Sequence, residues 1–174
     1  ISISGSSISN YLFNNLDSIA GSLSIYQVSN NNPILNFNSL SYVQSGISFI
    51  GPIQNVDVFP LLDSINYLSI QSTLVSNLGY SGLLYCGGIF LGSNGALTNI
   101  SGFQNLQELG SLTIAGNSNS ILQTISGFQN LQDLGSIQIG SHPFLSDISG
   151  FDHSLIISGT IEITNNLFLS ACSI

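Results

Sequence analysis

The sequence predicts an all-β fold, a right-handed parallel β-solenoid of about eight coils of 21–25 residues. Three observations predict it. A segment recurs along the chain, short alternating strands follow at one spacing, and an aromatic residue falls between successive strands. Because one such coil cannot bury its own apolar side, the coils are expected to stack and form a shared core.

The clearest repeat runs from Ile100 to Gly110, recurs almost unchanged from Ile125 to Gly135, and begins again at Ile148. A short strand follows each copy, and its apolar–polar–apolar alternation places two side chains on one face. The same kind of strand is found at every repeat, with first positions 21–25 residues apart. These strands are Ile1–Ile3, Leu23–Ile25, Ile47–Phe49, Leu68–Ile70, Ile89–Leu91, Leu112–Ile114, Ile137–Ile139 and Ile161–Ile163.

An aromatic residue lies between consecutive strands and is expected to form a stacked structural spine. The spine residues are Phe13, Phe37, Phe59, Tyr80, Phe103, Phe128 and Phe151. A leucine follows each aromatic by three residues, except in the last copy, where it slips to Leu155. We interpret these columns as core packing, and residues 1–174 as a single solenoid domain or a segment of a longer array, with the best repeats at 88–170.

A turn follows each strand and often carries asparagine five residues after the strand start, as at Asn94, Asn117 and Asn166. The side-chain amide of asparagine can bond neighbouring backbone groups at such turns. His142 holds this position in the remaining well-defined coil.

The charge composition excludes several classes of function. The chain has no Lys or Arg against 8 acidic residues, a formal net charge of -8. Without cations, binding to nucleic acid phosphates or to anionic lipid headgroups lacks its main energy term. Schiff-base and phosphoryl-transfer chemistry that uses lysine or arginine is excluded for the same reason.

The sequence predicts no membrane span, because its longest apolar stretch, residues 83–91, contains two glycines and is shorter than the roughly 18 residues a span needs. Serine, asparagine and glycine stand where charged residues usually cover a soluble protein. This composition favours an extracellular or cell-surface location.

At 100–117 and 125–142 the chain resembles the receptor L-domain branch of leucine-rich-repeat-like solenoids and the sporulation-type cell-wall proteins of fungi. These segments read as that family's I-x-G-F-x-x-L-x-x-L-G-x-L-x-I-x-x-N pattern, with His142 in the final Asn place of the second copy. The resemblance implies a non-enzymatic extracellular module that binds ligands, builds cell wall or adheres. The chain departs from the receptor members by lacking their cysteine-rich flanking modules, which makes receptor signalling the weaker inference.

We predict no catalytic, cofactor-binding or metal-ligating residues. His142, His153, Asp147 and Asp152 contain the side chains of a hydrolytic triad, but no nucleophile-elbow pattern accompanies them. The two histidines are expected on different sides of one coil, and their spacing to carboxylates matches no zinc or calcium signature.

Three surface features remain as candidates for function. The first is the column of residues at the strand centres, which is rich in hydroxyl groups in its first half. This column favours glycan contact or packing against another solenoid over ice binding. Its residues are Ser2, Ser24, Ser48, Ser69, Phe90, Thr113, Gln138 and Glu162. Asn99 begins the one N-glycosylation acceptor sequence, for use if the chain enters a eukaryotic secretory pathway. An acidic row of Asp17, Asp63, Glu108 and Asp133 is expected along one edge, as a solvated edge or a weak cation site.

Cys86 and Cys172 are separated by three to four coils, too far for the roughly 7 Å that a disulfide allows between Cα atoms. Cys86 is therefore expected to be a buried thiol and Cys172 a thiol able to bond elsewhere.

Both ends of the segment are expected to be buried against protein, because terminal coils expose core and strand edges. The residues predicted at these assembly ends are Ile1, Ile3, Cys172 and Ile174.

The leading functional hypothesis is a structural or adhesive surface protein, a subunit that self-associates end to end in a filament or cell-surface layer. The alternative is a receptor-type module that binds a glycan or protein ligand. Outward aromatic side chains favour the alternative, and the strand column offers Phe90 with Tyr26 and Tyr67 beside it.

Overall fold

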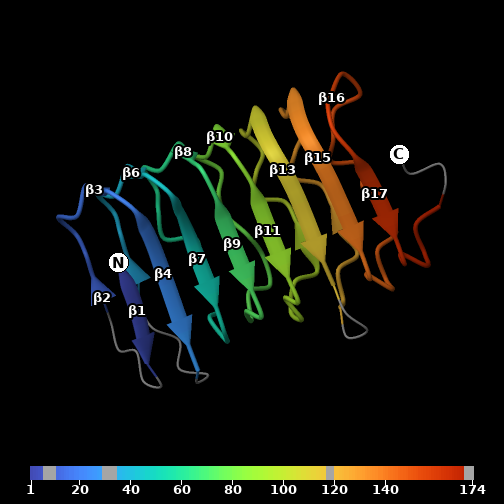
Figure 1. Cartoon of the computed structure of the whole chain (residues 1–174). Coiled ribbons are helices and arrows are strands. Elements are labelled where there is room, and N and C mark those ends of the chain that lie inside the picture. Colours follow the sequence, from blue (N-terminus) through green and yellow to red (C-terminus); the bar gives the residue numbers. More distant parts are fainter. Residues whose placement is uncertain (6–10, 29–34, 117–119, 171–174) are drawn as a thin grey trace.

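The computed structural model describes residues 1–5, 11–28, 35–116 and 120–170 of the 174-residue chain. These residues form strands and turns and contain no helix. The strands lie side by side along one axis from the N-terminal to the C-terminal end (Figure 1). Asn117, Cys172 and Ile174, which carried sequence predictions, lie outside the described residues.

The main sheet consists of parallel strands that occur once per coil and pair in chain order, β1-β4-β7-β9-β11-β13-β15-β17. Their bounds are β1 Ser2–Gly5, β4 Ser22–Gln27, β7 Gly46–Ile50, β9 Leu68–Gln71, β11 Ile89–Gly92, β13 Glu108–Ala115, β15 Asp133–Gly140 and β17 Ile161–Thr164. The predicted parallel solenoid is therefore confirmed. The number of complete turns is slightly lower than the eight expected, because eight successive strands enclose at most seven intervals.

The predicted strand phase is also confirmed, residue by residue. Ser2 pairs with Ser24, Ser24 with Ser48, and the column continues without a slip through Gln138 to Glu162. The apolar residues on either side of each centre point inward. A one-residue slip would turn every one of them outward, so burial of one face fixes the register.

Shorter strands form a second track just before the main strands, which the sequence did not predict. They are β3 Ser18–Ile19, β6 Tyr42–Val43, β8 Ser64–Ile65, β10 Tyr85–Cys86 and β16 Ile156–Ile157. β13 and β15 are long because each continues through both tracks. Two further pairs, β2 Tyr11–Leu12 with β5 Leu35–Asn36 and β12 Asn99–Ile100 with β14 Thr124–Ile125, lie on other sides of the coil.

The aromatic spine occupies the core and forms two runs. Phe13 stacks on Phe37 at a centroid distance of 4.9 Å, and Phe37 contacts Phe59 at 5.1 Å. Tyr80, Phe103, Phe128 and Phe151 form the second run, with centroids 5.1–5.6 Å apart and nearly parallel rings. The second run begins at Tyr80, whose buried hydroxyl donates to the Val56 carbonyl of the preceding coil at 2.7 Å and so orients the ring.

Each spine aromatic also starts a tight turn. The backbone N–H of the leucine three residues later donates to the aromatic residue's carbonyl, as from Leu106 to Phe103 at 3.1 Å and from Leu131 to Phe128 at 3.2 Å. In the last coil the same bond runs from Leu155 to Asp152, one residue later than the pattern. The leucine slip seen in the sequence is thus a shift of the turn itself.

Candidate functional surfaces

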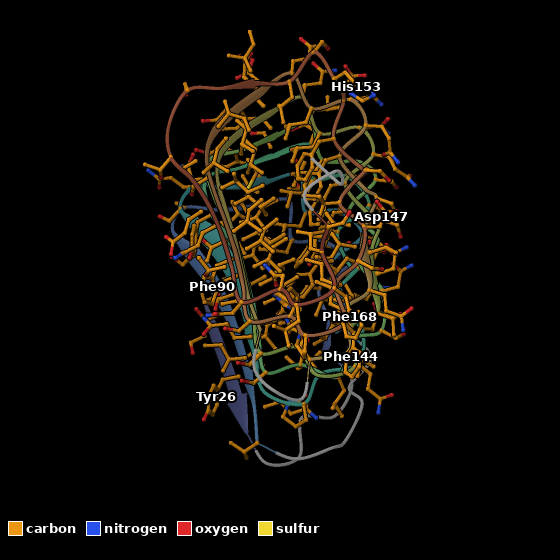
Figure 2. The ribbon with its side chains drawn as sticks, turned by 90° about the vertical axis from the view of Figure 1, so that its right-hand side faces the viewer. Tyr26, Phe90, Phe144, Asp147, His153 and Phe168 are labelled. Atoms are coloured by element: carbon orange, nitrogen blue, oxygen red, sulfur yellow. The ribbon has the colours of Figure 1, made fainter. Side chains whose placement is uncertain are left out.

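The outward face of the main sheet is a regular surface, with one parallel strand from each coil. Figure 2 shows Tyr26 and Phe90 on this side, away from Phe144 and Phe168. Serines of the first strands lie on it, and the columns beside the strand centre contain mostly serine, glycine and threonine. The side chains along this face are therefore short, and the few aromatic residues stand above them.

Two of these aromatics, Tyr67 and Phe90, form what we call the aromatic ridge. Tyr67 is 45% exposed, and in its column the neighbours are the glycines Gly46 and Gly88. A Cβ added at Gly88 would lie 3.1 Å from a Tyr67 ring carbon, so the ring leans over that glycine. The Phe90 ring lies in the same way over Gly92, where an added Cβ would approach to 2.5 Å.

Shallow grooves lie on either side of the ridge. The first groove, about 150 Å³, is lined by Ser22, Ser24, Ser45, Gly46, Ser48 and Tyr67 together with the strand backbone. The second groove, about 160 Å³, is lined by Ser111, Thr113, Ser136, Gln138, Thr160 and Glu162. In the second groove the Gln138 amide donates to the Glu162 carboxylate at 3.1 Å. Both grooves therefore present hydroxyl, amide or carboxylate groups and no cation.

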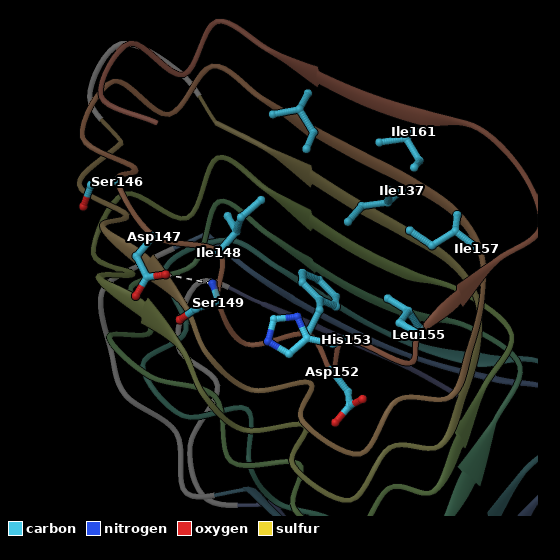
Figure 3. A pocket seen from close by; sticks show the side chains of 12 residues that line it. Ile137, Ser146, Asp147, Ile148, Ser149, Asp152, His153, Leu155, Ile157 and Ile161 are labelled. Atoms are coloured by element: carbon cyan, nitrogen blue, oxygen red, sulfur yellow. Dashed lines mark hydrogen bonds between the residues drawn. The ribbon is translucent and has the colours of Figure 1, made fainter. Parts of the chain in front are cut away.

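The C-terminal end of the solenoid is open in the described residues. A hollow of about 670 Å³ lies there, lined mainly by Ile148, Phe151, Leu155, Ile157 and Ile163 (Figure 3). Ile161, in the column of the buried Ile137, is 59% exposed because no described strand lies over it. The hollow is thus a cross-section of the core.

Polar residues at the rim of this hollow bond to their own turns. The Asp147 carboxylate accepts from the Ser149 N–H at 2.7 Å, and the Asp152 carboxylate accepts from the N–H of Ser154 at 2.7 Å and from its hydroxyl at 2.5 Å. The hydroxyl and N–H of Ser154 lower the pKa of Asp152, with a smaller contribution from the nearby His153. His153 itself is exposed.

His142 lies elsewhere, inside the solenoid, and takes the place that asparagine holds in other coils. The Asn94 and Asn166 amides donate to the carbonyls of Ile70 and Ile139, one coil back. His142 Nε2 lies 3.2 Å from the equivalent carbonyl of Ile114. Because a carbonyl only accepts, Nε2 carries the proton.

This tautomer leaves His142 Nδ1 as an acceptor for the Ser120 hydroxyl, 2.7 Å away. Serine and histidine at this distance resemble a nucleophile and its base. Both side chains are 5% exposed, however, and the adjoining cavity is about 10 Å³, smaller than any substrate. The pair satisfies buried polar groups. Of the residues considered for a triad, Asp147, Asp152 and His153 lie together at the open hollow, whereas the buried His142 lies apart from them.

The expected acidic row is split between two neighbouring columns. Glu108 and Asp133 pair directly across β13 and β15, and the same column continues through Tyr85 to Ser64. Asp63 precedes Ser64 by one residue, and Asp17 has the same offset at Ser18, so neither shares the column of Glu108. The sequence pattern could not show this offset, because the short strands of the second track have no alternation to set their phase.

Cys86 is a free, buried thiol, as predicted. Its Sγ donates to the Gly88 carbonyl at 3.2 Å, and burial raises the pKa of the thiol to about 12.

Asn99 lies in β12 and is half-buried, with its amide oxygen accepting from the hydroxyls of Thr124 at 2.6 Å and Ser126 at 3.1 Å. Glycosylation of Asn99 remains a prediction.

Neither a metal centre nor a membrane helix is indicated within the described part of the chain. It contains no group of three or more histidine, cysteine or acidic side chains arranged to hold a metal ion. A search of the same residues for a helix long and apolar enough to cross a membrane found none.

No family model, curated protein or solved structure matches this chain. The solenoid fold is established by the strand pairing described above. The finer resemblance to receptor L domains rests on the sequence motif alone.

Proposed function

We propose that this chain is a non-enzymatic structural or adhesive protein of the extracellular space or cell surface, whose copies associate end to end. The observation that carries the proposal is the open end. This hollow of about 670 Å³ leaves Ile161 exposed, although the neighbour of Ile161 in the same column, Ile137, is buried.

The two ends of the described body offer matching apolar columns, which makes a second copy a suitable cover. Among the described residues, the columns whose first members are Ile1 and Ile3 have Ile161 and Ile163 as their last members. In the same way Phe151 ends the aromatic spine that Phe13 begins. A copy placed one rung further along the axis, about 4.8 Å beyond β17, would continue each column.

The backbone supports the same contact. The outer edges of β1 and β17 have no strand beside them among the described residues. Such edges pair readily with another chain unless lysine or proline blocks them, and this sequence has no lysine. A head-to-tail contact of this type forms an open fibre when its rotation does not close.

The extracellular setting is part of the proposal and rests on composition and on the motif that resembles receptor L domains. Those domains and the fungal wall proteins act through surfaces, without catalysis. A receptor-type, ligand-binding module is the second candidate, and the aromatic ridge, with Tyr67 exposed and Phe90 half-buried, favours it.

Sedimentation velocity of the 174-residue chain over a range of concentrations tests the end-to-end contact. We expect species that grow with concentration, and expect Ile161→Asp to abolish the growth because it places a charge in the apolar junction. Ile121→Asp is the matched control, since Ile121 is also exposed but lies away from the hollow. A parent chain that stays monomeric throughout, or equal growth in both variants, would refute the proposal.

A further inference from the structure

The outward face of the main sheet has the chemistry of a binding site distinct from the ends. Its two grooves present four serine hydroxyls on one side of the aromatic ridge, and serine, threonine, amide and carboxylate groups on the other. The grooves span the strands from β4 to β17, six rungs of about 4.8 Å, or roughly 29 Å along the axis. The face therefore suits an extended ligand.

Tyr67 supplies the apolar contact. Glycines on both sides of it in the column leave no side chain to cover the ring, and its outer surface forms one wall of the first groove. Phe90 lies in the next coil, in the neighbouring column opposite Ser69, and is half-buried. Aromatic rings present an apolar face with a negative potential, which attracts the C–H face of a sugar ring.

Charge selects among ligands. The whole chain has a net charge of -8 and no cation, so an anionic polymer would be repelled with no group to pair it. A protein partner normally buries large side chains as anchors, and grooves this shallow hold none. A neutral ligand dense in hydroxyl groups satisfies the serine and threonine hydroxyls, because hydroxyls both donate and accept.

We propose that this face binds a neutral polysaccharide chain lying along the solenoid axis, with sugar rings stacked on Tyr67 and Phe90 and sugar hydroxyls bonded in the two grooves. The inference does not depend on the end-to-end contact, since the face is perpendicular to the ends. Where copies do stack, the face repeats along the fibre and binding gains avidity.

Native electrophoresis through gels containing soluble polysaccharide tests this inference. Hydroxyethyl cellulose and mannan are the neutral polymers, and alginate is the anionic one. We expect at least one neutral polymer to retard the chain and alginate to leave its mobility unchanged. Tyr67→Ala is expected to weaken retardation about tenfold, which corresponds to the loss of about 1.4 kcal/mol of stacking.

Tyr67→Phe keeps the ring and is expected to bind like the parent chain. Tyr85→Ala is the matched control, because Tyr85 is 43% exposed but lines neither groove. Thermal unfolding verifies that each variant is folded. Absence of retardation by both neutral polymers, or equal weakening by Tyr67→Ala and Tyr85→Ala, overturns the inference. Repeating the assay with Ile161→Asp separates it from assembly, because binding is expected to persist in chains that do not associate.

Discussion

Phenylalanine has two different uses in this chain, and position along the coil decides which. Phe128 is fully buried, with Phe103 and Phe151 at centroid distances of 5.3 Å and 5.1 Å. Phe144 stacks on Phe168 at 6.3 Å, yet is 51% exposed. Both are aromatic stacks between coils, but only the first excludes water on all sides.

Truncation of Phe128 tests the spine. Phe128→Ala removes a ring from a close-packed column, and we expect a loss of roughly 3–5 kcal/mol in the free energy of unfolding from the cavity left behind. Phe144→Ala is the control and is expected to cost less than about 1 kcal/mol, because much of that ring is already in water. Urea unfolding measures both. Similar losses in the two variants would contradict the assignment of the core.

His142 gives the molecule a pH dependence of defined sign. Burial lowers the pKa of His142 below its ordinary 6.5, against the smaller opposing effect of the Ile114 carbonyl. As the pH falls, the His142 imidazole is therefore protonated at a higher pH in the unfolded chain than in the folded one. The contribution of His142 to stability is complete above about pH 6.5 and declines below it, towards the lowered pKa of the folded state.

The asparagine that holds this place in other coils supplies the matching variant. Urea unfolding from about pH 7.5 to about pH 5.5 is expected to show a loss of stability in the parent chain that His142→Asn reduces. His153→Asn is the control, because it removes the other histidine of the chain, which is exposed. If the parent chain and His142→Asn lost the same stability over this pH range, the His142 imidazole would not be the source of the pH dependence.

At the scale of the strand, glycine permits the close spacing of β13 and β15. A Cβ added at Gly135 would lie 1.9 Å from the carbonyl oxygen of Gly110 in the preceding coil. Gly110 stands in the same relation to Gly87, at 2.2 Å. The backbones of successive coils therefore approach each other more closely here than any side chain allows. We call this column of glycines, at the point where the second track meets the main strands, the glycine ladder.

Substitution in this ladder is expected to separate the two strands. Gly135→Ala should cost about 1–3 kcal/mol or more in the free energy of unfolding, because the neighbouring atom is backbone and must move. Gly95→Ala is the control, since no atom lies within 4 Å of the added carbon. Thermal unfolding measures both variants. Equal melting temperatures for Gly135→Ala and Gly95→Ala would exclude a close backbone approach at Gly135.

The strands that the sequence predicted are those with two-residue alternation. Ser24 and Gln138 stand in the predicted column because apolar neighbours fix which face each strand buries. The two-residue strands of the second track were missed, since a pair such as Tyr85–Cys86 has no period to detect. The same lack of a period hid the one-residue offset of Asp17 and Asp63 from Glu108 and Asp133.

The candidate surfaces were less visible in the sequence than the strands. Tyr67 is recognisable as a binding platform only when its column neighbours, Gly46 and Gly88, are known. The partnership of His142 with Ser120 joins residues 22 positions apart, in successive coils. Both features depend on register between coils, whereas a motif search compares residues within one coil.

At the scale of the whole molecule, the solenoid separates two kinds of surface. The sides carry the carboxylates and hydroxyls together with single exposed apolar side chains such as Leu61 and Phe144, whereas the described C-terminal end exposes the apolar core. The apolar ends favour assembly, whereas electrostatic repulsion disfavours it, because each copy brings a formal charge of -8. Salt screens the repulsion and leaves the apolar contact, so association is expected to strengthen as ionic strength rises.

Electron cryomicroscopy of the protein at high concentration and moderate salt tests the central claim most directly. We predict rods in which β17 of one copy lies beside β1 of the next, so that the rung spacing of about 4.8 Å continues across each junction. Uniform single particles at every concentration, or rods joined through the outward face of the main sheet, would contradict the account.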